Sequence, residues 1–210
     1  MSKEKLFVKV CGITRLEDAD LAADHGATAI GFIFWPGSPR YISPQDARQI
    51  VRRKAAGVKA VGVFVDEPVE RVRQIAALVG LDLVQLHGTE STSVVRSLSR
   101  AGEATVIKAV GLTNGAAPDL TGFDDDVLIL LDAHDPARHG GTGRTIDWET
   151  ARRIALSRRT ILSGGLNPEN VGEAVSAVQP YGIDVSSGVE SAPGVKDAMR
   201  LKRLFEALND

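Results

Sequence analysis

The stretch Val127-Leu128-Ile129-Leu130-Leu131-Asp132 is a continuous apolar run that ends in a carboxylate. Gly140-Gly141-Thr142-Gly143 follows it in a loop whose glycines allow the backbone to approach an anion. Lys9-Val10-Cys11-Gly12 repeats the arrangement far away in the sequence and carries the only cysteine of the chain. A buried strand that delivers an ionisable group to a flexible loop is typical of an active site. The two strand ends therefore predict two proton-transfer groups, an acid and a base.

Eight apolar runs of this kind are spread along the chain. Most are continuously apolar instead of alternating, which is typical of a strand covered on both faces of a parallel sheet. Val, Ile, Leu and Phe dominate them. The predicted strands are residues 6–10, 29–34, 58–65, 81–86, 105–110, 127–131, 160–162 and 182–185.

Helix-like segments separate most of these runs, with apolar and charged residues at spacings of three and four. Two helix starts are marked by Ser43-Pro44 and Asn167-Pro168, where a capping side chain precedes proline at a first helical position. The fifth position is weakest, because residues 113–122 contain Gly, Pro and Asn and suit a loop or a short turn. The predicted helices are residues 16–23, 44–54, 69–79, 93–99, 148–156, 169–178 and 196–207.

Strand and helix units alternate through 210 residues with no linker or shift in composition. This pattern predicts an α/β fold in which residues 1–210 form a single (β/α)8 TIM barrel, at the small end of its size range. An open, doubly wound sheet is the second interpretation. Against it, the first strand-to-helix turn, Cys11-Gly12-Ile13-Thr14, lacks the glycine pattern of dinucleotide-binding sheets.

The composition and charge of the chain argue against several classes of function. The formal net charge is −2, from 25 Lys and Arg against 27 Asp and Glu, and no dense basic block suggests nucleic acid as a partner. One cysteine forms no internal disulfide, and residues 1–10 lack a signal-peptide core. No apolar run approaches the roughly 18 residues of a membrane span. We therefore expect a cytoplasmic protein that binds neither nucleic acid nor membrane.

In a barrel, chemistry lies at the carboxyl ends of the strands and in the loops that follow them. The polar residues predicted there are Cys11, Arg40, Gln85, His87, Lys108, Asp132 and Asp184. Hydrogen bonding that closes the barrel rim would explain any one of them alone. The whole set favours an active site.

Two glycine-containing loops predict a phosphate site. Ser163-Gly164-Gly165-Leu166-Asn167 follows the seventh strand and Ser186-Ser187-Gly188 follows the eighth, where barrels frequently bind phosphate. Tight turns alone would also explain glycines there. Gly141 and Gly143 would complete the ring of backbone N–H groups from the sixth loop. Residues 134–145 would then form a lid that closes over the phosphate, with a solvated loop as the alternative.

Six motifs lie in order along the chain: Lys9-Val10-Cys11-Gly12-Ile13-Thr14, Gly31-Phe32 with Ser38-Pro39-Arg40-Tyr41, Val84-Gln85-Leu86-His87-Gly88, Leu131-Asp132 with Gly140-Gly141-Thr142-Gly143, Gly164-Gly165-Leu166-Asn167-Pro168, and Asp184-Val185-Ser186-Ser187-Gly188-Val189-Glu190. Together they resemble the phosphoribosylanthranilate isomerase family over nearly the whole chain. The resemblance implies a barrel that performs an Amadori rearrangement in tryptophan biosynthesis, on a phosphorylated sugar-anthranilate substrate, without metal or organic cofactor. The product would be 1-(2-carboxyphenylamino)-1-deoxyribulose 5-phosphate.

The resemblance also implies the roles of the two proton-transfer groups. Asp132 would be the general acid that opens the ribose ring, and Cys11 the general base that removes the C2 proton. A basic cysteine needs a pKa below the usual value of about 8.5, and an acidic carboxyl needs a raised one. Lys9 lies two residues before Cys11 on the same strand face, so it is either the cation that activates the thiol or an ion-pair residue.

The remaining candidates have substrate-binding roles. Arg40 suits the anthranilate carboxylate, because a guanidinium binds a carboxylate with two hydrogen bonds. Gln85 and His87 suit hydrogen bonding at the rim, and Asp184 suits a substrate hydroxyl or neighbouring backbone. No metal-ligand spacing links the histidines His25, His134 and His139 to one another or to the cysteine.

Some observations leave alternatives. Asp66 stands where relatives often have Asn, and Cys11 stands where the related isomerase of histidine biosynthesis has Asp, which disfavours dual activity. Metal-dependent epimerases of pentose phosphates lack support, since the acids and second histidine of a metal cluster are missing. Monomer and homodimer are both open. A catalytically silent barrel that binds a sugar phosphate as a sensor or scaffold is the alternative function.

Overall fold

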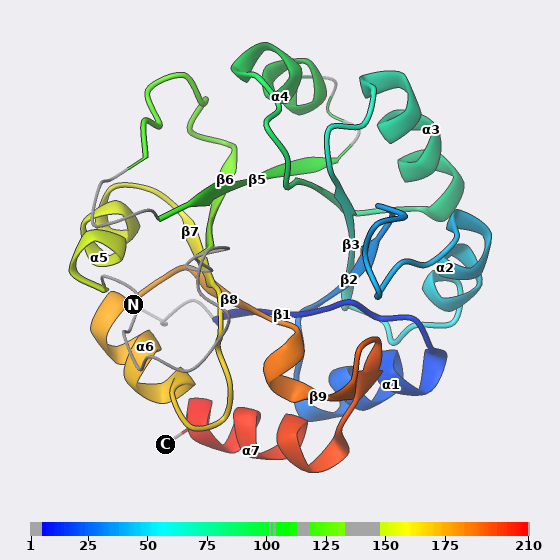
Figure 1. Cartoon of the computed structure of the whole chain (residues 1–210), viewed down its shortest axis with the longest axis vertical. Coiled ribbons are helices and arrows are strands. Elements are labelled where there is room, and N and C mark those ends of the chain that lie inside the picture. The colour runs from blue at the N-terminus through cyan, green and yellow to red at the C-terminus, as the bar shows by residue number, and fades with distance from the viewer. Residues whose placement is uncertain (1–5, 101, 103, 113–117, 133–147, 210) are drawn as a thin grey trace.

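The structure, a computed structural model, describes residues 6–100, 102, 104–112, 118–132 and 148–209. Eight parallel strands pair in chain order, and the eighth pairs with the first, so that the sheet closes into a barrel (Figure 1). All eight predicted strands and the predicted barrel are confirmed. The strands are β1 (Phe7–Cys11), β2 (Ala29–Ile33), β3 (Lys59–Phe64), β4 (Leu83–Leu86), β5 (Thr105–Gly111), β6 (Leu128–Asp132), β7 (Thr160–Ser163) and β8 (Gly182–Val185).

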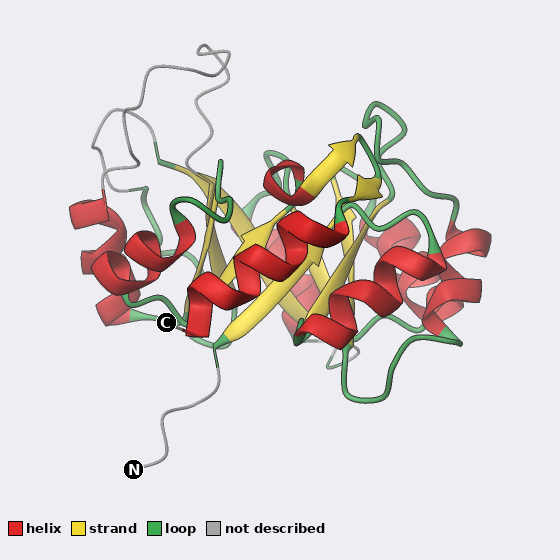
Figure 2. Ribbon diagram, turned by 90° about the horizontal axis from the view of Figure 1, so that it is seen from below, coloured by secondary structure: helices red, strands yellow, loops and turns green. Residues whose placement is uncertain are grey.

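The helices form a ring outside the barrel, as Figure 1 and the side view in Figure 2 show. Ser43 caps its helix as predicted, since its hydroxyl accepts a hydrogen bond from the backbone N–H of Asp46. Asn167 instead caps a turn that precedes its helix, accepting from the N–H groups of Glu169 and Asn170. The helices are α1 (Leu16–His25), α2 (Pro44–Val51), α3 (Val69–Val79), α4 (Thr92–Ser99), α5 (Trp148–Ser157), α6 (Val171–Val178) and α7 (Ala198–Asn209).

The connection from β5 to β6 has no helix in its described part, residue 112 and residues 118–127, in line with the weak fifth position. Arg158 stabilises this connection by donating to the carbonyl oxygens of Leu120, Asp124 and Val127. Three backbone acceptors on one guanidinium replace the hydrogen bonds that a helix would have made internally. No described helix is long and apolar enough to cross a membrane.

The barrel interior changes from apolar to polar along the strands. Alternate residues point inward, and an apolar cluster fills the part nearest the amino ends. Nearer the carboxyl ends, Lys9, Gln85 and Asp184 are buried polar side chains on the same inward-facing register. The apolar cluster is Phe7, Ala29, Val61, Leu83, Ile107, Ala109, Leu128, Leu130 and Ile161. Polar groups are costly to bury unless they are paired, so this end of the barrel is where a function is expected.

Lys108 is the exception among the residues predicted at the rim. It alternates with the inward-facing Ile107 and Ala109, so its side chain lies on the outer, helix-facing side of the sheet. There its ammonium pairs with Glu90 at 2.7 Å and donates to the carbonyl of Gly88 at 2.7 Å. Lys108 therefore points away from the barrel mouth and binds the loop that follows β4.

Candidate active site

The described site candidates gather at the carboxyl ends of the strands. Cys11 is the last residue of β1 and Asp132 the last residue of β6, while Gln85 and Asp184 lie inside β4 and β8. Going round the closed barrel, β8 and β7 separate β1 from β6 on one side and four strands separate them on the other. Cys11 and Asp132 thus lie on different sides of the mouth. Gly141, Gly143 and the predicted lid 134–145 lie outside the described residues.

Lys9 is a buried cation beside Cys11. Its ammonium lies 2.9 Å from the Oδ1 atom of Asp184, its register partner on β8. A Cβ atom on Gly31 would lie 2.9 Å from both the Cys11 Sγ and the Lys9 Cε, so glycine leaves room for both side chains. Burial alone would lower the pKa of Lys9, but Asp184 and Cys11 together raise it. Lys9 is therefore both an ion-pair residue and the cation next to the thiol, and Asp184 is its counter-ion.

The thiol of Cys11 is subject to opposing influences. Burial raises the pKa of Cys11 above its ordinary value, and the positive charge of Lys9 offsets only part of this rise. Asp184 adds to the rise, whereas Lys196 opposes it. A general-base role therefore needs a further positive charge close to the thiol.

Gln85, His87 and Asp132 form a chain of hydrogen bonds on the other side of the mouth. The Gln85 Nε2 lies 3.0 Å from the His87 Nδ1, and the His87 Nε2 lies 3.2 Å from the Asp132 Oδ2. An amide nitrogen only donates, so Nδ1 accepts and the ring proton is on Nε2. His87 therefore donates to one oxygen of Asp132 and orients its carboxyl group.

Contacts with Gly12 and Glu190 hold the Arg40 side chain at the site. A Cβ on Gly12 would lie 2.6 Å from the Arg40 Cδ, so the arginine stem crosses the backbone at a glycine with φ of +76°. Its Nε and Nη2 bind the carboxylate of Glu190 at 2.7–3.0 Å, which raises the pKa of Arg40. Nη1 is the guanidinium nitrogen outside this pair.

The two glycine loops predicted to bind phosphate lie side by side. A Cβ on Gly188 would lie only 2.0 Å from the carbonyl oxygen of Leu166, so glycine is required where the loops touch. Gly164 and Gly165 have φ of +89° and +69°, the left-handed region that favours glycine. Ser187 begins a short 3₁₀ turn, η1 (Ser187–Val189), next to them.

Two residues of the site, Glu190 and Lys196, are not among the candidates predicted from the sequence. They lie on a small hairpin after β8, made of β9 (Glu190–Ala192) and β10 (Val195–Lys196). The predicted helix 196–207 includes Lys196, but the observed helix begins at Ala198. The turn dipeptide Pro193-Gly194 between oppositely charged residues is the signal that could have indicated this hairpin.

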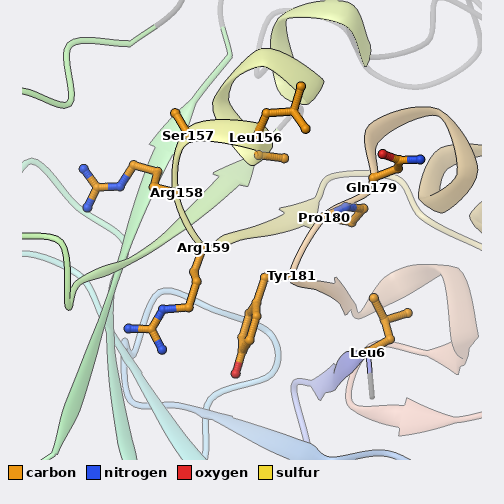
Figure 3. Close-up of a pocket in the computed structure, with 9 residues that line it drawn as sticks. Leu6, Leu156, Ser157, Arg158, Arg159, Gln179, Pro180 and Tyr181 are labelled. Carbon is orange, nitrogen blue, oxygen red and sulfur yellow. The ribbon is translucent and has the colours of Figure 1, made fainter. Parts of the chain in front are cut away.

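Other parts of the described surface do not resemble a site for this chemistry. Among the described residues, no three His, Cys, Asp or Glu side chains gather closely enough to hold a metal ion. A depression of about 450 Å³ lies near the amino ends of β1, β7 and β8, lined by Leu6, Arg159, Pro180, Tyr181 and their neighbours (Figure 3). The Arg159 guanidinium lies 5.9 Å from the centre of the Tyr181 ring there. This end of a barrel contributes stability, not catalysis.

Comparison with known proteins identifies the family. A family model described as N-(5'phosphoribosyl)anthranilate (PRA) isomerase matches residues 8–207. The chain belongs to the phosphoribosylanthranilate isomerase family. An N-(5'-phosphoribosyl)anthranilate isomerase of Syntrophus aciditrophicus is 48% identical over 203 residues, 96% of this chain and 86% of that protein. The isomerase of Thermotoga maritima is 46% identical over 200 residues, 95% of this chain and 96% of that protein.

Solved structures agree with the sequence comparison. The structure of the Thermotoga maritima isomerase has a TM-score of 0.87 and 43% identity, covering 98% of this chain and 99% of that one. Another isomerase, in complex with reduced 1-(o-carboxyphenylamino)-1-deoxyribulose 5-phosphate, has a TM-score of 0.83 and 41% identity, with coverage of 98% and 99%. The chain is therefore an enzyme, an isomerase of the aldose–ketose type that acts in tryptophan biosynthesis.

Proposed function

We propose that this chain converts N-(5'-phosphoribosyl)anthranilate to 1-(2-carboxyphenylamino)-1-deoxyribulose 5-phosphate with Asp132 as general acid and Cys11 as general base. The observation that carries the proposal is the arrangement of these two groups. Each ends a strand at the mouth of the barrel, and they lie on different sides of it. A substrate bound across the mouth would meet an acid at the ring oxygen and a base at C2.

Asp132 would act first. Its protonated carboxyl gives a proton to the ring oxygen of the ribose, the bond from C1 to that oxygen breaks, and the nitrogen lone pair forms an iminium ion. The Nε2 of His87 lies 3.2 Å from Oδ2 of Asp132. This hydrogen bond supports the role, because it holds the acid in one orientation.

Cys11 would act second, as a thiolate. It takes the C2 proton, the electrons of that C–H bond form the double bond between C1 and C2, and the iminium electrons return to nitrogen. The resulting enolamine tautomerises to the ketone. Burial raises the pKa of the thiol, but the ring-opened iminium brings a positive charge next to it, which favours loss of the thiol proton to solvent and so the thiolate. The acid step would thus help to create the base.

The other candidates would bind substrate or orient the groups that act on it. Arg40 would bind the anthranilate carboxylate with Nη1, its guanidinium nitrogen outside the Glu190 pair. Gln85 and His87 would orient the acid, and Asp184 would hold Lys9 and a substrate hydroxyl. The phosphate would lie against backbone N–H groups of Gly164, Gly165, Ser187 and Gly188, with Gly141 and Gly143 as further contacts.

Gly165 offers a test of the phosphate site. A methyl group at this position would meet no described atom within 4 Å, so it would project into space that the phosphate would otherwise occupy. We expect Gly165→Ala to raise KM about tenfold, the equivalent of ~1.4 kcal/mol of lost binding. The measurement is the KM for phosphoribosylanthranilate, together with the affinity for inorganic phosphate.

Gly102→Ala is the matched control. Gly102 also has φ of +69°, and a methyl group there would also meet no described atom within 4 Å, but this glycine lies after α4. Both variants should lose about 1–2 kcal/mol of stability from the left-handed backbone. Equal KM values in the two variants would contradict the phosphate assignment.

Turnover of the intact protein tests the proposed function as a whole. Freshly generated phosphoribosylanthranilate is followed by the loss of its fluorescence under steady-state conditions. We expect saturable turnover without added metal or cofactor. Binding of substrate by folded protein with no turnover would instead favour the catalytically silent barrel.

We also propose that residues 1–210 form one domain, which is stabilised by the closure of a single barrel, and that the protein acts in the cytoplasm.

Monomer and homodimer are both compatible with the proposed function. A solved structure concerns monomers generated from the dimeric isomerase of Thermotoga maritima, with 41% identity to this chain. Sedimentation of the purified protein would distinguish the two states.

A further inference from the structure

The hairpin β9–β10 carries a buried ion pair that lies next to Cys11. The Lys196 ammonium and the Glu190 carboxylate lie 2.7 Å apart, with side chains 0% and 4% exposed. Burying two charges is costly unless further hydrogen bonds satisfy them. The hydrogen-bond partners of this pair therefore indicate its role.

Lys196 binds the main chain of Cys11. Its Nζ donates to the Cys11 carbonyl at 2.5 Å, to Glu190 at 2.7 Å and to the carbonyl of Ser186 at 3.4 Å. Ser186 adds a second hydrogen bond to the same Cys11 carbonyl, from its hydroxyl at 3.2 Å. Two donors on one carbonyl fix the position of the peptide that follows β1. One of these donors, Lys196, lies 185 residues after Cys11 in the sequence.

Glu190 joins Lys196 to Arg40. Its carboxylate accepts from Arg40 through two nitrogens, from the Lys196 ammonium, and from the backbone N–H of Gly194 at 3.3 Å. Burial alone would raise the pKa of Glu190, but the hydrogen bonds from Arg40 and Lys196 lower it. Glu190 is therefore held as an anion by Arg40 and Lys196, and it raises the pKa of Lys196, which burial lowers.

The hairpin is itself anchored to the start of α1. The N–H of Lys196 donates to the Asp18 carboxylate at 3.2 Å, and the hydroxyl of Thr14 donates to the Gly194 carbonyl at 2.6 Å. Asp18 in turn pairs with Arg15 at 2.6 Å. Contacts with α1 and the residues before it therefore hold the Lys196–Glu190 pair independently of Arg40.

We propose that Lys196 and Glu190 are positioning residues for the reaction: Lys196 fixes the Cys11 backbone and keeps a cation near its thiol, and Glu190 holds Lys196 and Arg40 in place. This inference rests on the proposed role of Cys11 as general base. It adds to Lys9 a second lysine, from a distant part of the chain, that favours the thiolate.

Five charged groups surround the Cys11 region. Lys9 comes from β1, Asp184 from β8, Arg40 from the loop after β2, and Glu190 and Lys196 from the hairpin. Removal of a cation from this set raises the thiol pKa, and removal of an anion lowers it. Substitutions of Lys196 and Glu190 should therefore shift the thiol pKa in opposite directions, which a purely structural role does not predict.

The test is the pH dependence of alkylation. Cys11 is the only cysteine of the chain, so iodoacetamide reports on this thiol alone. We expect the midpoint to rise in Lys196→Met, with alkylation at fixed pH about 3- to 10-fold slower, since one pH unit is tenfold in thiolate. Lys196→Arg should restore the midpoint. Glu190→Gln should lower it, because the permanently charged Arg40 remains.

Lys202→Met is the control. Lys202 pairs with Glu206 on the exposed face of α7, at 3.8 Å, and its removal should leave the midpoint unchanged. An unchanged midpoint in Lys196→Met, or shifts of the same sign in the Lys196 and Glu190 variants, would overturn the proposal. If Lys196→Met does not fold, the direction of the shift in Glu190→Gln decides alone.

Activity separates this inference from the proposed function. Lys196→Met should lower kcat more than it changes KM, because the base and not the binding site is affected. If Cys11→Ser retained full activity, the general-base role would fail, whatever the alkylation midpoints showed. If Cys11→Ser were inactive and the midpoints did not move, only the positioning role would fail.

Discussion

Cys11→Ser is expected to lower kcat by about 10²- to 10⁴-fold, the usual contribution of a general base. Serine is close to cysteine in size, so the contact with Gly31 and the buried position, 5% exposed, should be retained. A hydroxyl loses its proton far less readily than a thiol, even next to the Lys9 ammonium. The measurement is steady-state turnover of phosphoribosylanthranilate, with circular dichroism to show that the barrel is folded.

Chemical modification provides a control that needs no substitution. Alkylation of the single cysteine of the natural chain should abolish turnover in proportion to the modified fraction, as measured by mass spectrometry. Product present during the reaction should slow the modification. If Cys11→Ser kept its kcat within tenfold of the natural chain, another group would have to be the base.

Asp132→Asn is expected to lower kcat by a similar factor, about 10²- to 10⁴-fold, or ~3–5 kcal/mol of transition-state stabilisation. The amide has the shape of the carboxyl and can still accept a hydrogen bond from the His87 Nε2. It has no acidic proton for the ring oxygen. Ring opening should therefore fail while the site remains assembled, and the same turnover assay measures this.

Binding of an open-chain product analogue distinguishes chemistry from folding. Reduced 1-(o-carboxyphenylamino)-1-deoxyribulose 5-phosphate requires no ring opening, so its affinity for Asp132→Asn should stay within about threefold, less than ~0.7 kcal/mol, of that for the natural chain. Asp20→Asn, on the exposed face of α1, is the matched control and should be fully active. A parallel loss of analogue binding and turnover in Asp132→Asn would indicate a structural role instead.

The pKa of Cys11 links these predictions to the electrostatics of the site. Burial raises this pKa although Lys9 and Lys196 both oppose the rise. The fraction of thiolate therefore grows as the pH rises toward the thiol pKa, and alkylation should accelerate with pH through the neutral range. Turnover should follow a different profile if Asp132 is the general acid, because the rate would then report the two groups as a pair.

The strands, the order of the units and the two strand ends that carry Cys11 and Asp132 could be predicted from the sequence. These features are local: an apolar run of three to eight residues indicates a buried strand, and the two-residue repeat of a strand places Cys11 on the same face as Lys9. Applied to β5, the same repeat places Ile107 and Ala109 inside the barrel and Lys108, which lies between them, on the outer face.

The tertiary structure decided which distant groups meet and how they are charged. Closure of the barrel brings β8 against β1, so that Asp184 becomes the partner of Lys9 and Lys196 reaches the Cys11 carbonyl. Burial then raises the thiol pKa that the lysines alone would lower. Contacts and desolvation of this kind depend on residues far apart in the chain, so the local pattern of the sequence does not contain them.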